Sequence, residues 1–388
     1  MEFLMGAQKQ IKLDVISKIE SGNMGRRQGE QVLDVSERTV ERYIANFRKK
    51  GVTFILHGNS GRKPANKTDA DLKQRVIKLV REKYHDFNMC HCLEKLKTDE
   101  KIEISRETFR RWCHEIRHVK RAKRRTAKAR YRRQRMQSTG LLLQMDGSPH
   151  KWFGGKEATL ITAIDDADSD IAYGEFFPAE DTLSCMTVLQ RIIELRGLFG
   201  ILYVDRAGLF GGQKRTQFSQ VKRALLELGI HTIYAQSAEA KGRIERTFNT
   251  LQDRIIPEMR LKGIKTYPAA NKYIQEEYFP KEWKDRFTVK PRNSQTAYRP
   301  LPTNVELKEI FCLKHHRTVK RDHTVTFESK LYSLKSPTKF SIYKQQIEFR
   351  TYQDITMKAF YAGNEIEIKL IETIDRGLPV YQSMKKIA

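Results

Sequence analysis

The sequence has few cysteines, no long apolar run and no surplus of acidic residues. Its five cysteines are too few and too scattered for a disulfide framework, which fits a reducing compartment. No apolar run approaches the roughly 20 residues that a membrane span requires. The first residues also lack the basic and apolar segments of a secretion signal. We therefore expect a soluble chain that stays in the cytoplasm and contacts no membrane.

Positive charge is what the sequence has in excess. Its 388 residues carry 73 Lys and Arg against 47 Asp and Glu, a net charge of +26, which indicates a polyanionic partner. The net charge is +18 over residues 1–140, zero over residues 141–288 and +8 over residues 289–388. The length predicts two to four domains, and the 39% of apolar residues is enough for their cores. The flanking segments are therefore predicted to hold the polyanion.

The most basic stretch is residues 117–135, with eleven Lys and Arg and no acid. Most of it falls in a predicted basic linker over residues 119–139. Such a run is either a solvated, self-repelling linker or an arm that follows DNA and releases counterions on binding. Beside helical DNA-binding patterns we favour the arm. Its predicted DNA contacts include Arg121, Arg124 and Arg125.

Residues 1–56 carry the pattern of a helix-turn-helix unit. Apolar residues at helical spacing predict helices near residues 11–19 and 26–33, and Ser36 is placed to cap a third. The third helix has a buried stripe of Val40, Tyr43, Ile44 and Phe47. Its outer face carries Arg38, Thr39 and Arg42, which we expect to enter the major groove of DNA. The alternative is an ordinary three-helix packing unit.

A second unit over residues 68–118 follows the same plan. One helix has a stripe of Leu72, Val76, Leu79 and Val80, and Ser105 is placed to cap another. That second helix should bury Phe109, Trp112, Cys113 and Ile116. Its outer face carries Arg106, Arg110 and Arg111, which suit phosphate or base-edge contacts. Between the two units, residues 57–67 form a basic linker similar to an AT-hook, in which Arg62 and Lys63 could lie in a minor groove.

Cysteine and histidine gather in the second unit and raise the possibility of a zinc site. The residues concerned are Cys90, His91, Cys92, Cys113 and His114. Their spacing fits no standard structural zinc pattern, and Cys113 already belongs to an apolar helical face. Buried thiols are therefore the favoured interpretation.

The neutral segment, residues 140–288, changes to an extended pattern. Apolar runs near residues 141–145, 158–164 and 171–177 predict strands, and residues 201–204 predict another. Residues 182–195 and 218–228 read as helices between and after them. Strands that first follow one another and then alternate with helices predict a mixed α/β sheet.

Three acids in this segment form the candidate site. Asp146 and Asp205 are each predicted to end an apolar strand, where a carboxylate must be paired or bound to a metal. A third, Glu245, lies in a helix from residue 240 to about residue 259, on a polar stripe beside the buried face. Converging there, the three could hold two divalent cations for phosphodiester chemistry. The alternatives are that the three acids are caps and surface pairs, or that Asp165 or Asp166 joins the metal site.

The order of these motifs resembles the DDE transposase and retroviral integrase superfamily, and most closely the ISNCY-type insertion sequence transposases. The residues that carry the resemblance are Gln144-Met145-Asp146-Gly147-Ser148, Ile164-Asp165-Asp166-Ala167, Tyr203-Val204-Asp205-Arg206, Ala240-Lys241-Gly242-Arg243-Ile244-Glu245-Arg246 and Leu251-Gln252-Asp253-Arg254. The resemblance covers most of the chain, because paired helix-turn-helix units precede the core in that family too. Two departures stand out. The 39 residues between Asp205 and Glu245 exceed the spacing typical of retroviral integrases, and the zinc-binding N-terminal domain of those integrases is absent.

The resemblance implies a multidomain metal-dependent enzyme. All-α helix-turn-helix units would precede an α/β RNase H-like core over residues 140–288, in which Asp146, Asp205 and Glu245 are the catalytic, metal-binding residues. They would hold two Mg²⁺ ions, with Mn²⁺ as a substitute, and Lys241 and Arg243 would hold DNA phosphates. The implied activity is cleavage of transposon ends at terminal inverted repeats and strand transfer into target DNA. The partners would be double-stranded DNA and further copies of the chain, in a dimer or a larger complex in the nucleoid of a prokaryote.

The last segment, residues 300–388, alternates short apolar strands with tight turns after a proline-marked boundary, which predicts a small all-β barrel. The resemblance implies an SH3-like barrel, and its charge suits nonspecific DNA contact or, alternatively, assembly. Two other functions remain open. One is a sequence-specific DNA-binding regulator with a catalytically silent core. The other is a structure-specific nuclease of the RNase H type, which would need no paired recognition units.

Overall fold

The structure is a computed structural model that describes residues 7–56, 68–118, 133–155, 157–205, 219–235, 241–336 and 340–373. The chain divides into two compact units, Met1–Arg75 and Val76–Ala388. Among the described residues, no helix is long and apolar enough to cross a membrane. The Arg62 and Lys63 linker and the run containing Arg121, Arg124 and Arg125 lie outside the described residues.

Three helices form the first unit, as the apolar periodicity predicts. They are α1 (Ala7–Glu20), α2 (Arg26–Leu33) and α3 (Glu37–Lys50), followed by the 3-10 turn η1 (Gly51–Ile55). Ile16, Val40 and Ile44 are buried at their centre. Ser36 precedes α3 as predicted, but its hydroxyl pairs with the hydroxyl of Thr39 at 3.0 Å.

Three further helices follow, where the sequence pattern predicts two. They are α4 (Ala70–Glu82), α5 (Met89–Thr98) and α6 (Arg106–Glu115). The Ser105 hydroxyl accepts a hydrogen bond from the Thr108 amide at 3.1 Å, which confirms the predicted cap of α6. Helix α5 is the unpredicted one, and its N-terminus is capped by Asn88.

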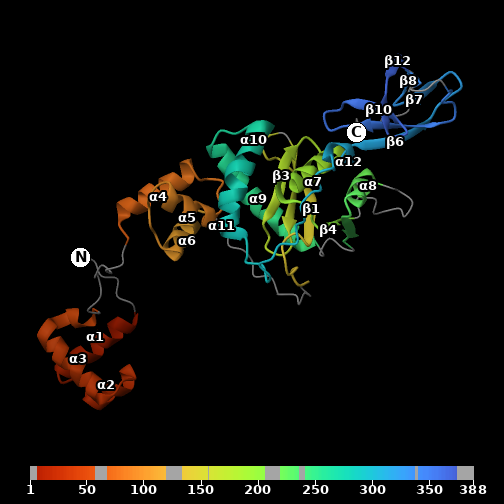
Figure 1. The fold of residues 1–388 in the computed structure, drawn as a ribbon. Helices are drawn as coiled ribbons and strands as arrows, with labels where there is room; N and C mark the ends of the chain where they lie inside the picture. The colour runs from red at the N-terminus through yellow and green to blue at the C-terminus, as the bar shows by residue number, and fades with distance from the viewer. Residues whose placement is uncertain are drawn as a thin grey trace, which may run out of the picture. The chain divides into compact units, whose positions relative to one another are not determined.

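A five-stranded mixed sheet lies at the centre of the second unit (Figure 1), with strand order β3-β2-β1-β4-β5. Its strands are β1 (Leu142–His150), β2 (Ala158–Asp165), β3 (Ile171–Phe177), β4 (Ile201–Val204) and β5 (His231–Tyr234). Strands β1 to β3 form an antiparallel meander, while β4 pairs in parallel with both β1 and β5. The predicted mixed α/β sheet is therefore present, with β5 as an additional edge strand.

Helices cover both faces of this sheet because β2 and β3 carry buried apolar residues on both of their sides. Leu143 and Met145 of β1 pack with α7 (Thr182–Arg196) and α8 (Gln220–Glu227). The other face packs against α9 (Gly242–Leu261), α10 (Tyr267–Tyr273) and the π-helical segment Ile274–Trp283, which continues into α11 (Lys284–Phe287). Helix α9 therefore packs on the face of the sheet opposite the one to which Leu143 and Met145 of β1 point.

The last part of the chain forms two small antiparallel sheets, and the described residues contain no closed barrel. After α12 (Leu307–Ile310), one sheet has the order β11-β10-β9-β6 and the other the order β12-β8-β7. Their strands are β6 (Leu313–Thr318), β7 (Thr324–Phe327), β8 (Lys330–Leu334), β9 (Gln346–Thr351), β10 (Met357–Tyr361), β11 (Asn364–Ile366) and β12 (Ile368–Thr373). The predicted barrel is therefore corrected. One residue after β11, the chain crosses to pair with β8, which splits the strands between two sheets that share an apolar core.

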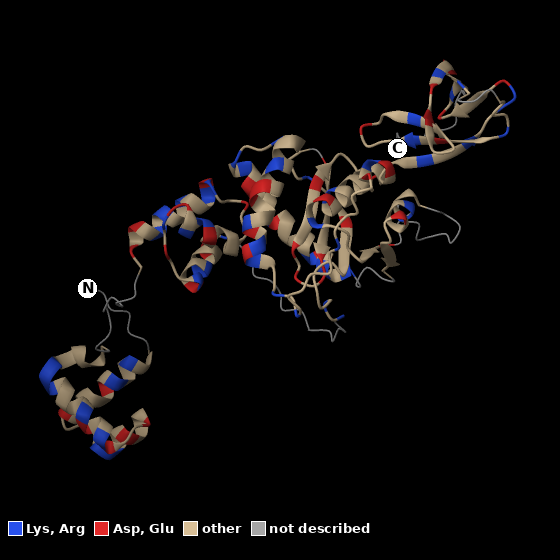
Figure 2. Ribbon diagram, in the orientation of Figure 1, with Lys and Arg blue, Asp and Glu red and all other residues tan. Residues whose placement is uncertain are grey.

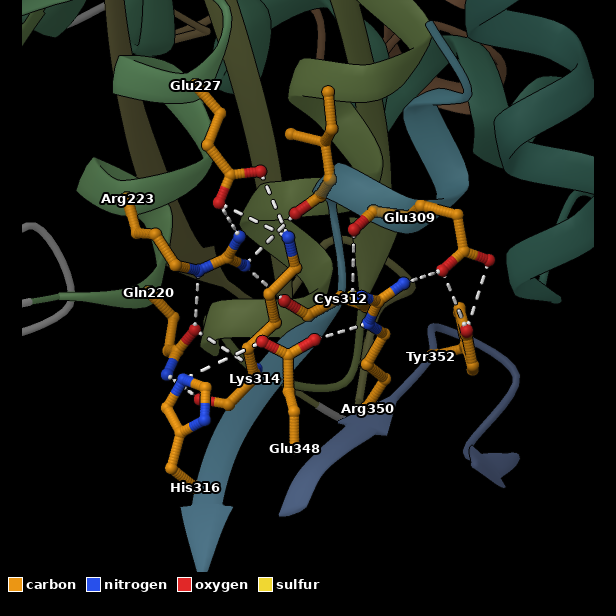
Figure 3. Close-up of polar contacts among 11 residues, drawn as sticks. Gln220, Arg223, Glu227, Glu309, Cys312, Lys314, His316, Glu348, Arg350 and Tyr352 are labelled. Carbon is orange, nitrogen blue, oxygen red and sulfur yellow. Dashed lines mark hydrogen bonds and ion pairs between the residues drawn. The ribbon is translucent and has the colours of Figure 1, made fainter. Parts of the chain in front are cut away.

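Polar contacts tie these sheets to the core (Figure 3). The Arg223 guanidinium of α8 donates to the carbonyl oxygens of Ile310 at 3.0 Å and Cys312 at 2.5 Å. The Lys314 ammonium of β6 pairs with Glu227 of α8 at 3.0 Å. Backbone carbonyls and side-chain carboxylates therefore both hold the start of β6 against α8.

Candidate active site

Asp146 and Asp205 lie at matching positions of neighbouring parallel strands. The register pairs Gln144 of β1 with Tyr203 of β4, and each aspartate follows two residues later. The two carboxylates lie close enough for the charge of Asp205 to raise the pKa of Asp146. One prediction is corrected here, because Asp146 lies inside β1 and does not end it: β1 stays paired with β2 as far as His150. Asp146 is instead placed where β1 separates from β4.

Helix α9 meets this part of β1 through its polar stripe. The Lys241 ammonium, at the N-cap of α9, lies 2.8 Å from Asp146 Oδ1. Eleven residues further along, the Gln252 amide donates to the Ser148 hydroxyl at 3.0 Å. Glu245 occupies the same stripe between these two contacts, but its side chain is exposed. The structure thus joins Asp146, Asp205 and Lys241, and leaves Glu245 on the adjoining turn.

The charges at Asp146 are closely balanced. Burial raises the pKa of Asp146, the Lys241 ammonium lowers it, and the negative charge of Asp205 raises it again, with a net upward direction. Two carboxylates that disfavour each other's ionised form are stabilised by a cation between or beside them. In the structure, the ammonium of Lys241 supplies that cation.

Glu180 is a further acid of this region that the sequence patterns do not single out. It lies in the loop between β3 and α7, and its carboxylate lies beside Gly147, where a Cβ would meet the carboxylate and require the Glu180 side chain to shift. Burial raises the pKa of Glu180, and the charges of Asp146 and Asp205 raise it further. In the sequence, an acid just before a helix reads as a cap, and only the glycine beside Asp146 signals a close neighbour.

Asp146 and Asp205 have the carboxylate oxygens that bind a divalent cation, but they supply only two ligands. Carboxylate oxygens are the ligands that Mg²⁺ and Mn²⁺ prefer, and Asp146 already holds a cation in Lys241. Over the part of the chain that the structure describes, no three His, Cys, Asp or Glu side chains form a group able to hold a metal ion. Asp146 and Asp205 therefore fit as two ligands of such an ion, and a third would have to come from a neighbouring element.

Asp165 and Asp166, the rival carboxylates, are buried and occupied by hydrogen bonds. Asp165 accepts from the Gly140 amide at 2.6 Å, the Ala167 amide at 3.0 Å and the Tyr298 hydroxyl at 3.3 Å. Asp166 accepts from the Met136 amide, the Gln144 amide group and the guanidinium groups of Arg133 and Arg243. Burial raises the pKa of Asp165 to about 6. Both act as hydrogen-bonding residues that close the β2 turn onto β1.

Two predicted phosphate-binding residues are engaged within the chain. Lys241 pairs with Asp146, and only 7% of its side chain is exposed. Arg243 pairs with Asp166 and also donates to the carbonyl oxygen of Arg133. Arg133 and Met136, in a stretch predicted to be linker, thus pack against the core.

The predicted DNA contacts of the helical units lie on exposed faces. Arg38 and Arg42 of α3 are exposed, while Thr39 is partly buried. Arg106, Arg110 and Arg111 of α6 are exposed as well. Arg110 forms a two-point contact with Glu107, and Arg106 lies 3.7 Å from the Cys90 sulfur. Lys and Arg share the helices of the first unit with Asp and Glu (Figure 2).

The cysteine and histidine cluster serves packing. His91 is buried and its Nε2 lies 2.7 Å from Glu258 of α9. Cys92 and Cys113 are buried among apolar side chains, and burial raises their thiol pKa values to about 12 and about 11. A thiol with such a pKa stays protonated at neutral pH and packs as a small apolar side chain.

Charged side chains fix α5 and the turn before it to the core. Glu258 also pairs with Lys95 at 2.8 Å, and Glu94 pairs with Arg254 at 2.8 Å and with Arg286. In the turn before α5, Asp86 pairs with Arg260 at 2.6 Å. Helix α9 therefore holds α5 along its C-terminal half, while its N-terminus lies beside Asp146.

Comparison with known proteins gives two relatives over most of the chain. A putative transposase, y4bF of Sinorhizobium fredii, is 29% identical over 378 residues, which span 94% of this chain and 81% of the relative. The transposase for insertion sequence IS1202 of Streptococcus pneumoniae is 27% identical over 388 residues, spanning 89% of this chain and 81% of the relative. The chain is related to transposases. No protein-family model matches it.

Solved structures give weaker likenesses than these two transposases. The catalytic core of HTLV-2 integrase, in complex with magnesium, covers 35% of this chain and 86% of its own length, with 14% identity and a TM-score of 0.29. A simian T-cell lymphotropic virus intasome in complex with the PP2A regulatory subunit B56 gamma covers 75% of this chain and 98% of its own, with 13% identity and a TM-score of 0.35. TM-scores this low do not establish a relation, so the relation of this chain to transposases rests on the two sequence relatives.

Proposed function

We propose that the chain is a DDE-type DNA transposase whose catalytic residues are Asp146, Asp205 and Glu245. The observation that supports the proposal is the closeness of Asp146 and Asp205 where β1 and β4 part, since the charge of Asp205 raises the pKa of Asp146, which also pairs with Lys241 of α9. The relation to two transposases over about nine tenths of the chain supports it. Glu245 is the acid on the stripe of α9 whose other members, Lys241 and Gln252, contact β1.

The proposed reaction needs divalent cations, which these acids would hold. Bound Mg²⁺, or Mn²⁺ in its place, supplies activation of the attacking hydroxyl and charge stabilisation at the scissile phosphate. The chain's own residues bind and orient the DNA. Asp146 and Asp205 present their carboxylates from a rigid sheet, and α9 sets the position of Glu245 relative to them. Asp165 and Asp166 keep β1 and β2 in place through their hydrogen bonds.

The partners follow from the charge distribution. The helical units would bind terminal inverted repeats in the helix-turn-helix manner, through Arg38, Thr39 and Arg42 and through Arg106, Arg110 and Arg111. The excess of positive charge over residues 1–140 supports a role in holding DNA. Residues 289–388, which include the C-terminal sheets, carry the remaining positive charge and would contact DNA nonspecifically. We assign the chain to the ISNCY-type transposases, which would act as an oligomer on transposon ends and target DNA in the nucleoid.

Strand transfer tests the proposal. A labelled transposon-end duplex is incubated with target DNA and Mg²⁺ or Mn²⁺, using the wild type and the variants Asp146→Asn, Asp205→Asn and Glu245→Gln. We expect each variant to lose at least about a hundredfold in rate, because one carboxylate is removed from the metal site. Asp253→Asn is the matched control, since Asp253 is an exposed acid of the same helix.

Two outcomes would contradict the proposal. Wild-type activity in Asp146→Asn and Glu245→Gln would remove both from the metal site. Specific binding of the transposon ends without cleavage by the wild type in either metal would favour a DNA-binding regulator with a silent core.

A further inference from the structure

Lys241 is a buried cation at the candidate site. Its side chain is 7% exposed, and its ammonium contacts the partly buried Asp146 at 2.8 Å. A buried ammonium is costly unless a carboxylate compensates it. The pair therefore stabilises both residues as long as no other cation enters.

A divalent ion on Asp146 would compete directly with Lys241. The ion and the ammonium would have to share one carboxylate in a partly buried setting, where two cations repel each other strongly. Asp205 adds negative charge to the same place, which strengthens the attraction for either cation. Entry of the metal therefore requires that the Lys241 ammonium leave Asp146.

Arg243, two residues away, lacks this freedom. Its guanidinium pairs with Asp166, which is fully buried and also binds Arg133, Gln144 and the Met136 amide. Moving Arg243 would break a buried network with several members. Within the described part of the chain, Lys241 forms an ion pair with Asp146, and its flexible four-carbon stem suits a compact charge that changes partners.

We propose that Lys241 is the resident counter-ion of the metal-free site, and that it couples metal binding to DNA binding. Metal takes Asp146 and frees Lys241 for a DNA phosphate, and a phosphate takes Lys241 and frees Asp146 for metal. Each ligand then raises the affinity of the other by the same factor, as linkage requires. The inference rests on the proposed function, because it assumes that Asp146 is a metal ligand and that DNA is the substrate.

Metal affinity without DNA gives the first test. Mn²⁺ is titrated calorimetrically into the full chain. Lys241→Met should bind Mn²⁺ about tenfold more tightly than the wild type, because no ammonium competes for Asp146. Lys241→Arg keeps the charge and should stay near the wild type. Lys262→Met removes an equal charge at the other end of α9, where Lys262 pairs with the exposed Glu277, and should leave the Mn²⁺ affinity unchanged.

DNA affinity gives the reciprocal test. Binding of a fluorescent transposon-end duplex is measured by anisotropy, with and without Mg²⁺ at constant ionic strength. For the wild type, Mg²⁺ should raise DNA affinity by about tenfold. Asp146→Asn releases Lys241, so it should bind DNA more tightly than the wild type without metal and lose the Mg²⁺ effect. Lys241→Met should also lose that effect.

Failure of the counter-ion role can be distinguished from failure of the proposed function. Mn²⁺ affinity of a folded Lys241→Met equal to or weaker than that of the wild type would overturn the counter-ion role, while strand transfer by the wild type would leave the proposed function intact. No Mn²⁺ binding to the wild type or to any Lys241 variant would overturn both. Circular dichroism establishes that each variant is folded before it is titrated.

Discussion

The two N-terminal helical units have the same sequence pattern but are stabilised differently. Helices α1 to α3 pack around a small apolar cluster of their own, centred on Ile16, Val40 and Ile44. Helices α4 to α6 also bury apolar side chains, but α5 is in addition joined to α9 by charged residues. The most buried of these is the cluster of His91, Glu258 and Lys95.

This difference bears on how each unit would present the helix that we propose contacts DNA. The exposed arginines of α6 belong to the second helical unit, α4 to α6. That unit is joined to α9, the helix that also carries Glu245. DNA held by α6 would therefore keep a set position relative to the candidate site. The first unit is a separate compact unit, so its stability should depend on its own small core.

The largest effect is expected from breaking the cluster at Glu258. Glu258→Gln removes the carboxylate that pairs with the buried His91 and with Lys95, and the loss of one partner from a buried pair should lower the free energy of unfolding by about 3 kcal/mol. Urea denaturation followed by tryptophan fluorescence measures this directly. All three tryptophans, Trp112, Trp152 and Trp283, lie in the second unit, so the first unit is silent in this signal.

The matched control for that change is Glu277→Gln. Glu277 pairs with Lys262 on the surface, with about half of its side chain exposed, and an exposed pair contributes below about 1 kcal/mol. If the two variants lose the same stability, the cluster between α5 and α9 does not hold the second unit together.

A smaller effect is expected from acid acting on the same cluster. Burial raises the pKa of Glu258, but hydrogen bonds from His91 and Lys95 outweigh it and hold the pKa below the usual value of 4.5. A carboxylate with a lowered folded-state pKa contributes stability above its unfolded pKa, and that contribution is lost as the pH falls through the folded value. The stability gap between wild type and Glu258→Gln should therefore shrink as the pH falls below about 4.5. Urea titrations at several pH values measure the gap, and a gap that widens in acid would contradict this origin.

Much of the architecture can be predicted from local patterns because the signals are strong. The bounds of α2, and the short apolar run of β4, match the structure closely. Asp146 and Asp205 stand out because each follows an apolar run, although the sequence alone places Asp146 at a strand end. Pairing of β1 with β2 beyond Asp146 is a non-local contact, which the local pattern does not contain.

The elements that escaped prediction are weakly apolar. Strand β5 alternates exposed and partly buried residues at the sheet edge, and β6 is mostly polar and has no buried residue. Helix α5 carries the cysteine and histidine cluster that suggests zinc, and its buried His91 is explained by Glu258, far away in the chain. A clear apolar periodicity in the sequence would have revealed β5, β6 and α5.

The residues with which individual charged side chains pair could not be predicted from the sequence either. Lys241 and Arg243 both read as phosphate-binding cations beside Glu245, yet in the structure they pair with Asp146 and Asp166. Glu180, which no sequence motif singles out, lies beside Gly147. Such pairings depend on how the sheet and α9 meet, which no local spacing determines.

The smallest effect is expected from overpacking the first unit at Gly29. This glycine of α2 is buried, and a Cβ there would lie 2.5 Å from the Ile19 side chain of α1. Gly29→Leu must displace Ile19, which should cost about 1–3 kcal/mol, partly offset by about 1 kcal/mol from better helix propensity. Gln31→Leu, at an exposed position of the same helix, is the control for the added leucine. Circular dichroism reports all helices and tryptophan fluorescence only the second unit. We expect Gly29→Leu to shift part of the unfolding transition seen by circular dichroism to a lower urea concentration. The transition seen by tryptophan fluorescence should not move, because the two cores are separate. A tryptophan transition that moves with the dichroism would mean that the second unit depends on the first.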